Sequence, residues 1–306
     1  MIRYFFIVNP IAANGRTKRV WTRLNNILKN CAIDYQFAFT KQAGDAILLA
    51  RHALQCGYNR IIAVGGDGTL NEVVNAFFEH DVNIFRNAAL GVLNSGTGGD
   101  FCRTIALHRN PVKALPGLLN ASPHYVDVGS ISYVDFQGKT KTRYFINIAD
   151  AGIGAATAHR VNKTSKFLGG FLSFLQAAVY TIFTYNPKHI KVTVDEKTLT
   201  SGNPSIVVVA NGRYFAGGMH VAPEARLDDA QLDIIYVNNR SRIQLLHCLA
   251  MVYRGKHINH PCVLTHKGHN ITLESTDKVL LEAEGEVLGF LPAKFSIIPK
   301  ALQVIY

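Results

Sequence analysis

The stretch from Ile61 to Ala76, which reads IIAVGGDGTLNEVVNA, constrains the fold of this chain most strongly. Its apolar start is typical of a buried strand, and the segment after the glycines has apolar residues at helical spacing. Glycine lets the backbone approach a phosphate closely, and the free N–H groups of a first helical turn point towards such an anion. The stretch therefore predicts a strand, a turn and a helix, with a phosphate site or a plain tight turn between them.

Other strands and helices alternate with this unit through the first part of the chain. The order predicts a Rossmann-like α/β domain over residues 1–124, with a parallel sheet covered by helices. The expected strands are residues 4–8, 35–39, 61–64 and 89–92, and the expected helices around them are residues 17–30 and 43–56.

A second turn of small residues follows the strand at residues 89–92. It runs from Asn94 to Phe101 and reads NSGTGGDF. In open α/β sheets, ligands lie outside the carboxyl ends of the strands. Two glycine-rich turns at such ends favour a phosphate site more than either turn alone.

The pattern changes at Tyr125, where short alternating strands begin to dominate. They predict a mainly antiparallel β-sandwich over residues 125–306, with the C-terminal strand either ending there or returning to the first domain. The expected strands are residues 125–133, 142–148, 189–194, 205–210, 232–237, 269–275, 279–284 and 295–298.

Composition and charge restrict the partners. The 306 residues are 48% hydrophobic and only 17% charged, which fits a large core and excludes a disordered chain. Lys and Arg outnumber Asp and Glu by 32 to 21, and this excess favours nucleotide phosphates, anionic lipid or nucleic acid. We find no motif that interleaves aromatic and basic residues, so we expect no nucleic-acid partner.

The cysteines and the N-terminus indicate a cytoplasmic location. The five cysteines are odd in number and lack CxxC spacing, so they are expected to be reduced thiols. The apolar run at the N-terminus is too short for a signal peptide.

A helix expected over residues 159–185 contains the longest uncharged stretch, residues 167–187. A membrane-spanning helix needs about 20 apolar residues, so its length would permit a span. A polar stripe at helical spacing instead favours a helix packed on the domain or touching a membrane surface. The stripe consists of Ser173, Gln176, Tyr180 and Thr184, and Lys163 and Lys166 before it would rest on lipid headgroups or in solvent.

Several motifs, in the right order, resemble the diacylglycerol kinase catalytic family, whose superfamily includes sphingosine kinases and NAD kinase. GGDGTLNEV resembles the family's GGDGTxNEV, NPIAANG its NPxxG opening, and GTGGDF its GTxNDF. NIADAGIG resembles FxNxxGxG, residues 211–233 resemble NGxxxGGGxxxAPxAxxDDGxLD, and AEGE resembles a DGE turn. The resemblance spans nearly the whole chain and implies a two-domain kinase fold. Departures include Gly99 in place of asparagine and Glu284 in place of aspartate.

The resemblance implies that ATP lies between the two domains. Mg²⁺ near Asp67 and Asp100 would bridge its phosphates and spread the transferring charge. The implied nucleotide ligands are Asn9, Thr40, Gly65, Gly66, Asp67, Gly68, Thr69, Leu70, Asn71, Glu72, Gly96 and Thr97.

The resemblance implies that the acidic turn near the C-terminus supplies the catalytic base. Glu284 or Glu286 would take the proton from a substrate hydroxyl, an effect typically worth about 10²- to 10⁴-fold. Which of the two is the base stays open, as does a plain surface turn.

The second domain contains two candidate metal sites. The resemblance implies a structural Mg²⁺ on Asp229 with the carbonyls of Arg226 and Gln231, a ligand set that suits a hard cation. A histidine-rich segment also suggests zinc, but its spacing is looser than in zinc sites, and zinc is not favoured. This segment contains His257, His260, Cys262, His266 and His269.

The sequence thus predicts an ATP- and Mg²⁺-dependent lipid kinase that associates peripherally with the inner face of the membrane. Its acceptor would be the hydroxyl of a diacylglycerol-, phosphatidylglycerol- or sphingoid-type lipid. The alternatives are an NAD kinase and a non-catalytic relative that binds nucleotide or lipid.

Overall fold

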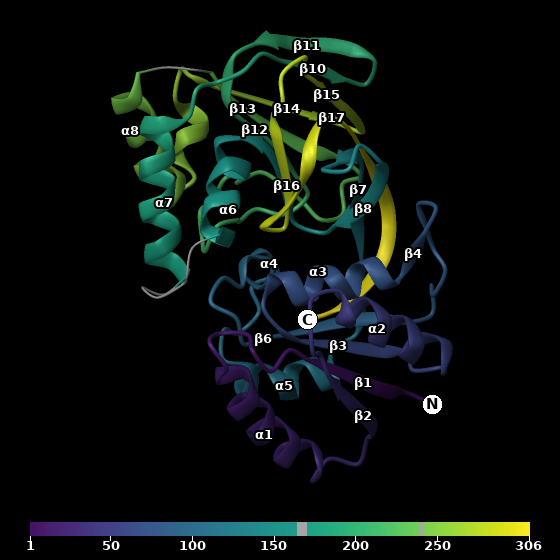
Figure 1. Cartoon of the computed structure of the whole chain (residues 1–306). Helices are drawn as coiled ribbons and strands as arrows, with labels where there is room; N and C mark the ends of the chain where they lie inside the picture. The colour runs from purple at the N-terminus through teal and green to yellow at the C-terminus, as the bar shows by residue number, and fades with distance from the viewer. Residues whose placement is uncertain (164–169, 239–240) are drawn as a thin grey trace. The chain divides into compact units, whose positions relative to one another are not determined.

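The computed structural model describes residues 1–163, 170–238 and 241–306 (Figure 1). The chain forms two units. Unit 1 comprises residues 1–128 and 299–306, and unit 2 comprises residues 129–298.

Unit 1 contains a parallel sheet in the order β17-β6-β3-β1-β2. Its strands are β1 (Arg3–Val8), β2 (Asp34–Phe39), β3 (Arg60–Gly65), β6 (Ala89–Asn94) and the last residues of β17 (Glu286–Ile305). Its helices are α1 (Arg16–Leu28), α2 (Asp45–Gln55), α3 (Asp67–Ala76), α4 (Asp100–Thr104) and α5 (Pro111–Asn120), and a small hairpin joins β4 (Phe78–Glu79) to β5 (Val82–Asn83).

Strands β1, β3 and β6 are buried along almost their whole length, whereas the edge strand β2 is largely exposed. Phe6, Ile62 and Leu93 pack on one face against Trp21 of α1 and Leu115 of α5. A parallel sheet with helices on its faces needs such continuous apolar runs. This explains why the runs before the two glycine-rich turns show no polar alternation.

Unit 2 is antiparallel, with the central order β14-β13-β12-β9-β16-β17. Around it, β15 pairs with β10 and β17, β10 pairs with β11, and β7 pairs with β8 and β17. Its strands are β7 (Pro123–Asp135, beginning in unit 1), β8 (Thr140–Phe145), β9 (Ile148–Gly152), β10 (Ile190–Val194), β11 (Lys197–Gly202), β12 (Pro204–Ala210), β13 (Leu232–Asn238), β14 (Val263–Gly268), β15 (Asn270–Glu274), β16 (Leu280–Ala283) and β17 up to residue 298.

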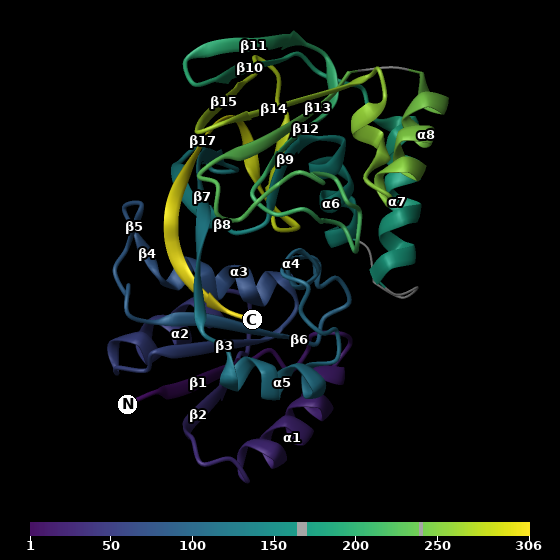
Figure 2. The same cartoon turned by 180° about the vertical axis from the view of Figure 1, so that it is seen from behind.

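Alternate residues of β12 and β13 enter two separate cores. Val207 and Ile234 join a core between sheet faces, whereas Val208 and Ile235 join a core that also contains helix residues. The helices are α6 (Ile153–Lys163), α7 (Gly170–Thr184), α8 (Arg242–Val252) and the short η1 (Lys256–Asn259). The views in Figure 1 and Figure 2 show α6, α7 and α8 gathered on one side of β12 and β13.

The predicted fold class, a parallel α/β domain with an antiparallel β-sandwich, is confirmed. The helix predicted to start at His159 starts instead at Ile153, because the Asp150 carboxylate accepts from the Ala155 N–H in its first turn. Strands β9, β11 and β14 and the short β4 and β5 were not predicted. The side chains of Lys163, Lys166 and Ser173 lie outside the described residues. Over the three described ranges, no helix has the length and apolar character needed to cross a membrane.

Candidate active site

The two glycine-rich turns of unit 1 pack against each other through their backbones. The N–H groups of Ser95 and Gly96 donate to the Gly65 carbonyl over 2.9 and 3.1 Å. A Cβ atom on Gly96 would lie 2.5 Å from the Gly66 Cα, so no larger residue fits there without displacing the first turn. Gly66 is also the N-cap of α3, and no side-chain cap bonds to this helix among the described residues. The first N–H groups of α3 thus suit an anionic ligand.

Asp67, predicted to act near a metal, anchors the second turn instead. Its carboxylate accepts from the N–H groups of Gly99, Asp100 and Phe101 over 2.7, 3.0 and 3.4 Å. These groups start α4, so the carboxylate sits at a helix N-terminus. Burial raises the pKa of Asp67, and the three N–H groups oppose that shift.

Asp100 also has a protein partner. Its Oδ1 accepts from Arg103 over 2.6 Å, and the same guanidinium nitrogen donates to the Gly98 carbonyl. Both carboxylates therefore position the second turn, and a Mg²⁺ ion beside them stays a prediction.

Glu72, predicted as a nucleotide ligand, caps a neighbouring helix. Its two carboxylate oxygens accept from the N–H groups of Gly44 and Ala46 over 2.9 and 3.0 Å. Gly44 is the N-cap of α2, which offers no capping side chain of its own. Glu72 therefore ties α3 to the start of α2.

The remaining predicted nucleotide ligands gather at the carboxyl ends of the strands. The Asn9 side chain donates to the Thr69 hydroxyl over 3.0 Å, and the Thr40 N–H donates to the Val8 carbonyl over 2.9 Å. Thr97 is exposed. Leu70 and Asn71 are buried, with 2% and 1% exposure, so their side chains belong to the protein interior.

The acidic turn of unit 2 is a tight hairpin between β16 and β17. Glu284 and Gly285 have φ angles of 55° and 83°, a pattern typical of a two-residue hairpin turn. One Glu284 oxygen accepts from the N–H groups of Ile146 and Asn147 over 2.9 and 2.7 Å. The structure thus brings the NIADAGIG segment and the acidic turn together.

Glu286 lies one residue beyond the turn and forms an ion pair. Its carboxylate contacts the Arg143 guanidinium over 2.8 Å, and its side chain is 43% exposed. The two predicted bases therefore differ in their surroundings. Backbone N–H groups fix the carboxylate of Glu284, whereas the Arg143 guanidinium offsets the charge of Glu286.

A buried pair of acids beside this hairpin was missed by sequence reasoning. Asp150 on β9 and Glu282 on β16 are cross-strand partners, with 0% and 4% exposure. Burial raises the pKa of Asp150 to about 6 and that of Glu282 well above its ordinary value. Two carboxyl groups buried side by side cannot both ionise, so the pair keeps a proton.

This protonated pair supports the turn. A Glu282 oxygen accepts from the Gly285 N–H over 2.7 Å. The signal was visible in the sequence, because acids at positions 282, 284 and 286 alternate along one strand and its turn. Their different environments were not visible.

Comparison with known proteins assigns both halves of the chain. Residues 3–131 match the diacylglycerol kinase catalytic domain, and residues 147–306 match the YegS C-terminal NAD kinase beta sandwich-like domain. The chain belongs to the diacylglycerol kinase family. It is therefore a kinase, and ATP is the substrate that such a family implies.

The similarity to individual proteins extends over the full length. A diacylglycerol kinase of Staphylococcus carnosus is 29% identical over 299 residues, which cover 97% of this chain and 93% of that protein. A Bacillus anthracis structure provisionally described as a diacylglycerol kinase has a TM-score of 0.80 at 24% identity and covers 99% of this chain and 95% of its own. Yeast NADH kinase has a TM-score of 0.51 at 10% identity, covers 99% of this chain and 82% of its own, and shows a shared fold alone.

In this kinase, Asp229, one of the residues predicted to hold a structural Mg²⁺, contacts a lysine. The Lys267 ammonium lies 3.1 Å from Asp229, 3.4 Å from Asp233 and 3.3 Å from the Glu224 carbonyl. Two carboxylates and a carbonyl would otherwise suit a hard cation. The ammonium competes with Mg²⁺ for Asp229, and the predicted set of Arg226, Asp229 and Gln231 stays a prediction.

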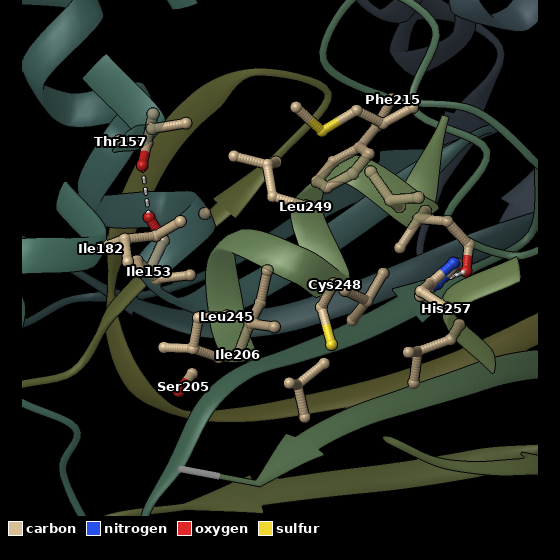
Figure 3. A pocket seen from close by; sticks show the side chains of 18 of the residues that line it. Ile153, Thr157, Ile182, Ser205, Ile206, Phe215, Leu245, Cys248, Leu249 and His257 are labelled. Atoms are coloured by element: carbon tan, nitrogen blue, oxygen red, sulfur yellow. Dashed lines mark hydrogen bonds between the residues drawn. The ribbon is translucent and has the colours of Figure 1, made fainter. Parts of the chain in front are cut away.

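Unit 2 of the kinase also contains an apolar cavity of about 120 Å³ (Figure 3). It lies among α6, α7, α8 and strands β12 and β13. Its larger lining side chains include Ile153, Phe174, Ile182, Ile206, Val208, Phe215, Leu245, Leu249 and Val252.

The cavity adjoins the buried acid pair. Gly154 belongs to its lining, and a Cβ atom on Gly154 would lie 2.4 Å from both carboxylate oxygens of Asp150. The acidic turn and the apolar space are therefore parts of one region of unit 2.

Proposed function

We propose that this kinase transfers the γ-phosphate of ATP to the hydroxyl of a membrane lipid. The apolar cavity beside the buried acids carries the proposal. An acyl or sphingoid chain entering it would gain about 0.8 kcal/mol for each buried methylene. A nicotinamide dinucleotide would instead place polar groups against a wall that cannot hydrogen-bond them.

The donor side of the reaction belongs to unit 1. The phosphates of ATP would accept hydrogen bonds from the uncapped N–H groups at the start of α3, where the helix dipole also favours negative charge. Asp67 and Asp100 hold the second turn against the first, which fixes the backbone donors before the substrate arrives. Mg²⁺ enters as part of the MgATP substrate.

The acceptor side belongs to unit 2, where we assign Glu284 as the general base. Two backbone N–H groups fix its carboxylate, whereas Arg143 offsets the charge of Glu286. Glu284 takes the proton of the lipid hydroxyl, the hydroxyl oxygen bonds to the γ-phosphorus, and the bond to the β-phosphate oxygen breaks. The products are a lipid phosphate and ADP.

Apolar residues on α7 and α8 support peripheral contact with a membrane. Phe183 and Ile243 are 56% and 79% exposed, and their helices also line the cavity. Insertion of such side chains into the bilayer surface would bring the cavity to its lipid. Sedimentation with anionic vesicles should fall when both residues become serine.

Phosphate transfer from radiolabelled ATP tests the proposal. The acceptors are diacylglycerol, phosphatidylglycerol, a sphingoid base and ceramide in mixed micelles, with NAD in a parallel reaction. We expect label in one lipid and none in NAD. Label in NAD alone would restore the NAD kinase alternative, and ATP binding without any label would establish a non-catalytic relative.

A cavity variant makes this test specific. Ala178 lines the cavity from α7, whereas Thr184 is exposed on the same helix. Ala178→Phe should raise the KM for a long-chain lipid and leave the KM for ATP unchanged, whereas Thr184→Phe should change neither.

A further inference from the structure

Three potential metal ligands converge in unit 2, away from the acidic turn. Cys248 lies on α8, His260 follows η1, and Cys262 precedes β14. The two Sγ atoms are 3.4 Å apart, and the His260 Nδ1 is 2.9 Å from the Cys262 Sγ. One ligand atom from each residue lies within 4.8 Å of the others. This grouping differs from the histidine-rich segment of the sequence, because its third member comes from a different helix.

The group is built into the protein interior. Cys248 and Cys262 are 8% and 1% exposed and pack in the apolar core beside α8. The Cys262 N–H donates to the His260 Nδ1 over 3.3 Å, so this nitrogen carries a lone pair. A metal at this nitrogen would take the place of that weak hydrogen bond.

Charge balance explains how such a group can be buried. Two thiolates and one neutral imidazole around a divalent ion have no net charge, which an apolar core tolerates.

We propose that Cys248, His260 and Cys262 bind a zinc ion. Two sulfur ligands and one nitrogen ligand within a single small group favour this borderline-soft metal over Mg²⁺ or Ca²⁺. Water or the exposed His247 would supply the fourth ligand of a tetrahedral zinc site. The ring centroid of His247 lies 5.8 Å from that of His260.

The ion would join α8 to the segment that leads into β14. Cys248 also lines the apolar cavity, so zinc would fix one of its walls (Figure 3). The inference does not depend on the proposed lipid kinase activity, because it rests on ligand geometry alone.

Cobalt(II) titration of the reduced, chelator-treated full chain tests the site. We expect visible bands of tetrahedral cobalt and a sulfur-to-cobalt charge-transfer band that saturate at one equivalent, together with a rise of several degrees in Tm on adding zinc. Cys262→Ser should lose the charge-transfer band. The matched control is Cys56→Ser, because Cys56 is an exposed thiol 3.8 Å from His52 and should not contribute.

Retained MgATP binding shows that the variants are folded. The proposal is overturned if folded wild-type protein gives no charge-transfer band, or if the band survives Cys262→Ser and disappears in Cys56→Ser. A Cys248–Cys262 disulfide in freshly purified, unreduced protein, detected by mass spectrometry, would overturn it as well.

Discussion

The acids of unit 1 and the acids of unit 2 come from similar glycine-rich motifs but have opposite surroundings. Asp67 and Glu72 face backbone N–H groups at the starts of α4 and α2. Asp150 and Glu282 face each other in a buried pair that shares a proton. The first pair accepts hydrogen bonds from helix N-termini, whereas the second pair cannot ionise fully.

The difference shows that the acidic residues of a motif need not take part in the reaction themselves. In unit 1 the carboxylates shape the turns, and the backbone of those turns is what we propose to bind phosphate. In unit 2 the buried pair supports a hairpin that presents a third carboxylate, Glu284. The environment of each acid therefore decides its role more than its place in the motif.

The largest effect on stability is expected for Asp67→Ala. It leaves up to three N–H groups at the start of α4 without their acceptor, so the free energy of unfolding should fall by roughly 3 kcal/mol. Urea unfolding measures the loss. The control is Asp228→Ala, because Asp228 forms an exposed ion pair with Arg226 that contributes little. Equal effects of the two substitutions would refute an anchoring role for Asp67.

Loss of the internal cation should have the next largest effect. Lys267→Met leaves Asp229 and Asp233 as uncompensated neighbours, and the free energy of unfolding should fall by about 1–3 kcal/mol. Because the ammonium is then gone, Mg²⁺ should restore part of the lost Tm. Lys191→Met, which removes an exposed ion pair with Glu274, should show neither response. A Mg²⁺-dependent Tm in the wild type but not in Lys267→Met would contradict the assignment.

The shared proton predicts a pH dependence of stability. The pKa of Asp150 rises from 3.8 to about 6 on folding, and that of Glu282 rises further from its usual range. As the pH rises, these groups therefore lose their protons in the unfolded chain at a lower pH than in the folded chain. The free energy of unfolding falls from about pH 4 through 6 and beyond, by about 1.4 kcal/mol per unit of pKa shift. Glu282→Gln should flatten this slope in urea unfolding from pH 4.5 to 8, and parallel curves for the two proteins would argue against a shared proton.

The smallest effect is expected for Glu72→Gln. The change weakens one helix cap and should lower the free energy of unfolding by about 1 kcal/mol. The KM for ATP should stay unchanged. A raised KM with an unchanged Tm would instead show that Glu72 touches the nucleotide.

The sequence could predict the parts of the site that depend on local pattern. Strand-turn-helix units placed both glycine-rich turns at the carboxyl ends of parallel strands, and the resemblance of AEGE to a DGE turn placed Glu284 on a turn. These features repeat over a few residues, so periodicity and turn chemistry reveal them.

The partners of the charged side chains could not be predicted, because they lie far apart in the chain. Asp67 meets N–H groups more than 30 residues later, and Lys267 meets Asp229 across 38 positions. Cys248 and Cys262 are 14 residues apart on different elements. No local pattern indicates these pairings, since the packing of the folded sheets alone creates them.

A comparison of kcat between the Glu284→Gln and Glu286→Gln variants tests most directly whether the environment of an acid decides which one is the general base. With MgATP and the accepted lipid both saturating, we expect Glu284→Gln to lose about 10²- to 10⁴-fold in kcat at an unchanged Tm. Glu286→Gln, which removes a carboxylate already paired with Arg143, should lose much less. An active Glu284→Gln beside an inactive Glu286→Gln would contradict the account.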